Sequence, residues 1–121
     1  SNSAFLFDSK GDILWKWKSP GAVEGLSAIP DSGLIGALVS HNYIENSLEA
    51  SGFYFLKYQP ERQEPIARLG EFQLKGIAVT GDFSHSGTYF AGVEVPIKLE
   101  DDTVVGGHHL HIIPMKFIAG E

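Results

Sequence analysis

The amino-acid sequence predicts an all-β protein built from repeated antiparallel meanders. Short runs rich in Val, Ile, Phe, Tyr and Trp alternate with turn residues, and the 121-residue chain holds 14 Gly and 6 Pro. Such runs favour strands, and no segment keeps a helical period for long. A Ser-Gly turn occurs at Ser32-Gly33 and again at Ser86-Gly87, 54 residues later. A fixed period indicates a repeat architecture, in which each unit buries its apolar face on a neighbour.

The sequence predicts a series of short strands separated by tight turns. In chain order the strands are residues 4–8, 13–18, 23–29, 34–41, 53–58, 64–69, 77–83, 89–95 and 108–113. Gly, Pro, Asp or Ser occupy the turns at residues 9–12, 30–33, 60–62 and 84–87. Antiparallel hairpins need these residue types, and we expect Gly33 and Gly87 each to hold a positive φ. Residues 42–48 could instead form one helical turn.

Composition excludes several classes of partner and chemistry. The formal net charge is −6, and no stretch gathers Lys or Arg into a stripe that could neutralise phosphates. We therefore expect neither nucleic acid nor a membrane surface as a partner. Cysteine is absent, which excludes disulfides and thiolate catalysis. No apolar run approaches the roughly 20 residues that span a bilayer.

Two local motifs resemble β-propeller repeats. Residues 6–17, LFDSKGDILWKW, resemble the strand, Asp, turn, Gly, strand, Trp hairpin of pyrroloquinoline-quinone-type repeats. Residues 82–92, DFSHSGTYFAG, resemble the hairpin of WD-repeat-like blades, and residues 29–37 are a weaker copy. The resemblance implies antiparallel four-stranded meanders arranged as β-propeller-like blades. The Trp-Asp and Gly-His dipeptides of true WD repeats are missing where they are expected, so no function is carried over from that family.

The resemblance divides the chain into blades. Residues 4–18 would be the outer half of one blade, 23–69 a complete blade, and 77–113 most of a third. Closed propellers have at least about four blades. Residues 4–118 are therefore expected to be one all-β domain or a fragment of a larger propeller, and the open edges should make the isolated segment self-associate. The first three residues, Ser1-Asn2-Ser3, resemble a cloning scar. A small β-sandwich or barrel is the alternative fold.

Two long acidic connections are the candidate binding face. In a propeller, the connections at residues 41–51 and 96–106 would lie on one face of the disc. Long loops in compact domains are often functional, and the other interpretation of these two is solvated hairpin tips with no role. A polar recognition face would contact a protein partner, a sugar or a cation, and the acidic tip offers oxygen ligands for calcium without the spacing of an EF-hand. The candidate residues are His41, Asn42, Tyr43, Glu45, Glu49, Glu100, Asp101 and Asp102.

Three histidines in one predicted strand suggest a metal site. His109 and His111 should project from the same face, with His108 on the other. An H-x-H pair on a strand can supply two zinc or copper ligands, and the third could come from His85 or from an acidic loop. The other interpretation is a polar edge that only forms hydrogen bonds. No other cofactor is predicted.

Trp15 and Trp17 alternate with polar or aliphatic neighbours, so both indoles should lie on one face of a strand. They could pack between adjacent sheets or form an exposed stacking platform for a sugar ring.

The sequence lacks the motifs of common enzymes. There is no G-x-S-x-G, H-E-x-x-H, P-loop or dinucleotide-binding motif. Carboxylates such as Glu24, Asp82 and Glu94 could be paired for glycoside hydrolysis, but nothing in their spacing selects them. The sequence therefore predicts a non-catalytic binding or scaffolding segment of a β-propeller, with contacts made by the long acidic loops. The alternative is a small β-sandwich module that binds carbohydrate or metal.

Overall fold

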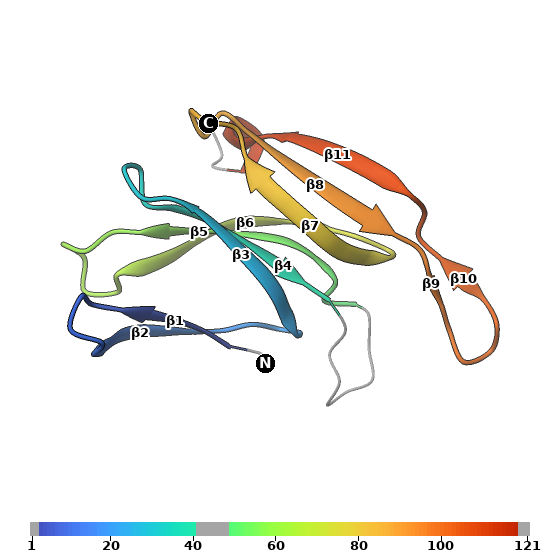
Figure 1. Ribbon diagram of the computed structural model, residues 1–121, viewed down its shortest axis with the longest axis horizontal. Coiled ribbons are helices and arrows are strands. Elements are labelled where there is room, and N and C mark those ends of the chain that lie inside the picture. The colour runs from blue at the N-terminus through green and yellow to red at the C-terminus, as the bar shows by residue number, and fades with distance from the viewer. Residues whose placement is uncertain (1–2, 41–48, 119–121) are drawn as a thin grey trace.

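Antiparallel sheets stack in three layers in the computed structural model, which describes residues 3–40 and 49–118 (Figure 1). The first layer is the hairpin of β1 (Ser3–Phe7) and β2 (Ile13–Lys18). The middle layer is a four-stranded meander of β3 (Val23–Ile29), β4 (Leu34–Val39), β5 (Gly52–Tyr58) and β6 (Ile66–Gln73). The third layer contains β7 (Ile77–Phe83), β8 (Tyr89–Val95) and β11 (His109–Pro114) in the order β11-β8-β7.

The all-β class is confirmed, and each predicted strand has a counterpart. A short hairpin, β9 (Ile97–Lys98) with β10 (Val104–Val105), was not predicted and interrupts the third-layer meander between β8 and β11. One turn of helix, α1 (Met115–Ile118), follows β11. Among the described residues, no helix is long and apolar enough to cross a membrane. The possible helical turn at residues 42–48 lies outside the described residues.

The main difference in strand bounds lies in β6. The prediction ended this strand at residue 69, whereas β6 continues to Gln73. Its last residues pair with the start of β5, Phe72 with Phe53 and Gln73 with Gly52. A bulge between Phe55 and Leu56 shifts the register within this pair of strands. Pairing with the buried first residues of β5 therefore sets the length of β6 more than its own mixed composition does.

The larger core lies between the middle and third layers. Alternate residues of β4 and β5 face the third layer, and Phe53, Phe55 and Phe90 are completely buried there. The rings meet in edge-to-face and tilted contacts, with centroids 5.1 Å apart for Phe55 and Phe90 and 5.4 Å apart for Phe53 and Phe90. These geometries add to the burial of apolar area that holds the two sheets together.

The other face of the middle layer meets the β1–β2 hairpin. Ala37, Val39 and Tyr54 are buried on this face, and the ring of Trp17 lies 6.0 Å from that of Tyr54. Trp15 also lines a small hollow against the middle layer. The two indoles therefore pack between sheets, and the middle layer is covered on both faces. This explains why β5 reads as an almost continuous apolar run.

The recurring Ser-Gly turns have the backbone conformation that the sequence predicted. Gly33 connects β3 to β4 with φ 72°, and Gly87 connects β7 to β8 with φ 77°. In both turns the Gly N–H donates to a carbonyl three residues earlier, that of Pro30 or Ser84. Glycine adopts this left-handed conformation without the steric cost that a Cβ brings.

Candidate functional site

The pairing of β8 with β11 brings one acid and two histidines together. Glu94 lies directly opposite His109 in the ladder, and His111 lies opposite Gly92, two residues along. All three side chains are on the face that meets the middle layer, because residues two apart on a strand share a face. The candidate ligand atoms of these residues lie within 4.8 Å of one another.

One oxygen of Glu94 is the centre of this group. Oε1 of Glu94 lies 3.0 Å from Nδ1 of His109 and 2.9 Å from Nε2 of His111. Oε2 accepts a hydrogen bond of 2.8 Å from the backbone N–H of Gly76. Glu94 is only 4% exposed, so the carboxylate sits at the bottom of the group with both oxygens engaged. Such engagement is what a buried charge requires.

The hydrogen bonds keep Glu94 ionised. Burial alone would raise the pKa of this carboxyl, but hydrogen bonds from His111, His109 and the Gly76 N–H outweigh burial and lower the pKa from 4.5 to about 2. Hydrogen bonds to the charged form favour that form. A negative charge is therefore held beneath the two imidazoles.

The two histidines differ in exposure. The His111 side chain is 23% exposed and packs against aromatic rings, with its ring centroid 5.0 Å from that of Phe72 and 6.2 Å from that of Phe53. The His109 side chain is 59% exposed. The group opens into a hollow of about 350 Å³, which Phe72 and Lys75 also line. Solvent therefore reaches the group from the His109 side.

Residues from three of the loops between strands surround the Glu94 carboxylate. Gly106 has φ 79°, and a Cβ there would come within 2.6 Å of the Gly76 backbone and 2.9 Å of Glu94 Oε2. The fully buried Ser51 donates a hydrogen bond of 2.5 Å from Oγ to the carbonyl of Gly76. Gly76 is thus held through its carbonyl by Ser51, and it holds Glu94 through its own N–H.

The structure brings two of the predicted metal ligands together and leaves the others apart. His109 and His111 do lie on one face, and His108 lies outside the group. His85 is exposed in the turn that joins Phe83 to Tyr89, at the end of the β7–β8 hairpin opposite to Glu94, so it is remote from the pair. The acidic residues of the β9–β10 tip are also outside the group. The third member is Glu94, which is not among the predicted metal ligands.

A sequence signal for Glu94 did exist. In the alternation of β8, Glu94 falls on the same face as Phe90 and Gly92, both of which are buried. An acid in a core-facing position of a strand needs a polar partner, and the H-x-H pair follows one connection later.

The second acidic connection is an ordered hairpin rather than an irregular loop. Glu100, Asp101 and Asp102 form the exposed tip of β9–β10. Hydrogen bonding from Thr103 lowers the pKa of Asp101, and Asp102 adopts φ 67° and lies 3.3 Å from the Lys98 ammonium. The tip carboxylates of residues 101 and 102 are thus used in turn formation, and among the described residues they belong to no group of converging metal ligands.

The first acidic connection is described only in part. His41, Asn42, Tyr43 and Glu45 lie outside the described residues. Glu49 is exposed and lines a hollow of about 610 Å³ together with Trp17, Tyr54 and Arg68.

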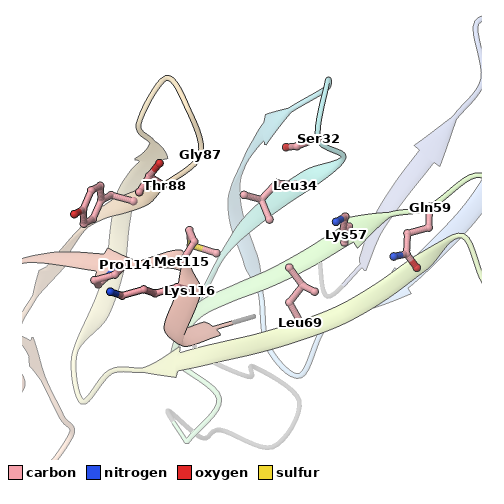
Figure 2. A pocket seen from close by; sticks show the side chains of 11 residues that line it. Ser32, Leu34, Lys57, Gln59, Leu69, Gly87, Thr88, Pro114, Met115 and Lys116 are labelled. Atoms are coloured by element: carbon pink, nitrogen blue, oxygen red, sulfur yellow. The ribbon is translucent and has the colours of Figure 1, made fainter. Parts of the chain in front are cut away.

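Another hollow, of about 500 Å³, lies between the β3–β4 and β7–β8 turns (Figure 2). Leu34, Leu69 and Met115 form its apolar wall, and Lys57 and Lys116 also line it. The described residues that line it include no carboxylate or imidazole, so they do not offer a set of metal ligands.

Comparison of the chain with protein-family models, with curated proteins and with solved structures found no match.

Proposed function

We propose that this chain is a non-catalytic binding or scaffolding segment of a β-propeller. The observation that supports this function is the pair of apolar faces on the outside of the stack. Phe5 and Phe7 of β1 are exposed on the first layer, and Leu110 and Ile112 of β11 are exposed on the third. Further sheets of the same kind would cover these faces, as one blade covers the next.

The stacking of the layers favours this function over the sandwich alternative. A two-sheet sandwich buries one face of each sheet and leaves the other polar. Here β5 is buried on both faces, between Trp17 on one side and Phe90 on the other. The meander order of β3-β4-β5-β6 is also that of a complete propeller blade.

Binding would take place at the connections, with the sheets as a rigid support. The β9–β10 hairpin projects beyond the third layer (Figure 1) and exposes Glu100, Asp101 and Asp102 at its tip. Together with the net charge of −6, this hairpin suits a protein partner with a basic surface. Loops carried by a rigid scaffold commonly supply such contacts.

Light scattering after size-exclusion chromatography tests the proposal. The chain should form dimers or larger species at micromolar concentrations, because an uncovered apolar face is a template for association. A Leu110→Lys, Ile112→Lys double variant should shift the population towards monomer. Val104→Lys is the control, because Val104 is equally exposed but lies on the β9–β10 hairpin. A parent that stays monomeric at high micromolar concentration and unfolds cooperatively would contradict the proposal and favour the sandwich.

A further inference from the structure

We propose that Glu94, His109 and His111 form a binding site for zinc. This site is independent of the scaffolding function, because its ligands face the middle layer whereas the scaffolding proposal rests on the opposite face of β11.

The spacing of the three ligand atoms suits a bound metal. Glu94 Oε1 lies 3.0 Å from His109 Nδ1 and 2.9 Å from His111 Nε2. Ligand bonds of about 2.0–2.1 Å give ligand–ligand separations of about 2.9 Å at right angles and about 3.3 Å at the tetrahedral angle. The two imidazole nitrogens lie within 4.8 Å of each other, and movement of the exposed His109 side chain would bring all three atoms to bonding distance of one ion.

The ligand types select the metal. Two imidazoles and one carboxylate are the set found in zinc sites that keep an open coordination position. Calcium and magnesium prefer sites built from oxygen ligands alone. The carboxylate supplies the negative charge, and each imidazole supplies a neutral nitrogen. Water or a group from a ligand would complete the coordination on the exposed His109 side.

The surroundings hold the ligands in place. The Gly76 N–H fixes Glu94 Oε2, which leaves Oε1 for the ion. His111 is kept in orientation by the rings of Phe72 and Phe53. Such support around a ligand raises metal affinity, because the side chains lose little conformational freedom when the ion binds.

Metal binding competes with a hydrogen-bonded form of the same three residues. When Nδ1 of His109 and Nε2 of His111 donate to Glu94, each ring carries its proton on the nitrogen that faces the carboxylate. Zinc requires the lone pair of that same nitrogen, so each imidazole would shift its proton to the remote nitrogen when the ion binds. A cluster that forms hydrogen bonds only is the competing outcome.

Zinc titration of the untagged, chelator-treated protein against a chromophoric chelator tests the site. The parent should bind one equivalent with micromolar or better affinity. His109→Ala removes an exposed ligand without opening the core, and it should weaken affinity by more than about tenfold. His108→Ala is the matched control, because His108 is a neighbouring exposed histidine outside the group, and it should bind as the parent does.

Two further readouts separate loss of the site from loss of the fold. Zinc should raise the melting temperature of the parent and leave that of a His109→Ala, His111→Ala double variant unchanged. Co²⁺ should show a ligand-field spectrum with the parent that the double variant lacks. A folded parent that neither binds zinc at micromolar concentrations nor perturbs Co²⁺, or a His108→Ala variant as impaired as His109→Ala, would overturn the site. Neither result would affect the self-association that tests the scaffolding function.

Discussion

The ring of Phe53 in β5 lies directly against the backbone of Gly92 in β8. A Cβ at residue 92 would overlap this ring, so only glycine leaves room for Phe53 here. The same ring also contacts His111, which shares a side of β11 with His109. The close approach of the sheets therefore sets both the core and the position of the candidate metal ligands.

Gly92→Ala should lower the free energy of unfolding by about 1–3 kcal/mol, because the new methyl group forces Phe53 out of its position. Phe53→Leu alone should also destabilise, by removing ring contacts. In the double variant the shorter leucine side chain leaves room for the methyl group. The double variant should therefore lose less stability than the sum of the losses in the two single variants. Denaturant unfolding of the four proteins measures this coupling. Additive costs would show that the overlap is not the cause.

The stability cost of replacing Gly87 should depend on how readily the new residue adopts a positive φ. Gly87→Val should destabilise by more than about 1 kcal/mol, because a β-branched residue is strained at φ 77°. Gly87→Asn is the matched variant, since Asn adopts the left-handed conformation more readily, and it should cost less. Thermal unfolding gives the melting temperatures of the parent and both variants. Equal melting temperatures for parent and Gly87→Val would remove the conformational argument for this turn.

The strands could be predicted because each is bounded by its own turn signal. Gly33 and Gly87 mark tight connections, and β-branched and aromatic residues fill the runs between them. The β9–β10 hairpin escaped prediction because each of its strands is only two residues long. So short a run shows no periodicity, and the hairpin depends on Asp102 taking a conformation that a non-glycine residue rarely adopts.

The candidate site was only half predictable. Strand alternation places His109 and His111 on one face from sequence alone. Alternation in β8 also marks Glu94 as an acid on a core-facing side, but its pairing with these two histidines depends on the register between β8 and β11, which the inserted hairpin separates in the chain. The contact of Gly76 with Glu94 depends in turn on the packing of two sheets. Nothing local in the sequence encodes such long-range relationships.

Ser51 should be important for stability although it is a small polar residue. Its hydroxyl is fully buried and donates to the carbonyl of Gly76, so Ser51→Ala would leave that carbonyl without this donor. We expect a loss of about 1–3 kcal/mol in the free energy of unfolding. Ser86→Ala is the control, because the Ser86 hydroxyl is exposed and pairs with that of Thr88, which is exposed too. Similar unfolding curves for the two variants would contradict the structural role of the Ser51 hydroxyl.

Tyr54 should make the protein less stable in alkali. Burial, followed by the nearby negative charge of Glu71, raises the pKa of this phenol from 10.0 to about 12. The folded state therefore keeps the phenolic proton between pH 10 and 12, whereas the unfolded state loses it. Stability is complete below pH 10 and should fall across this interval, by on the order of 2–3 kcal/mol.

Tyr54→Phe isolates this contribution. The variant loses the hydrogen bond from the Tyr54 hydroxyl to the Ala50 carbonyl, so it should be less stable than the parent at neutral pH. Its stability should then fall less steeply between pH 10 and 12, because no proton remains at this position to be lost. Tyr89→Phe, at an exposed tyrosine, should keep the slope of the parent. Urea unfolding at several alkaline pH values measures the slopes, and equal slopes for Tyr54→Phe and the parent would show that another group causes the alkaline loss.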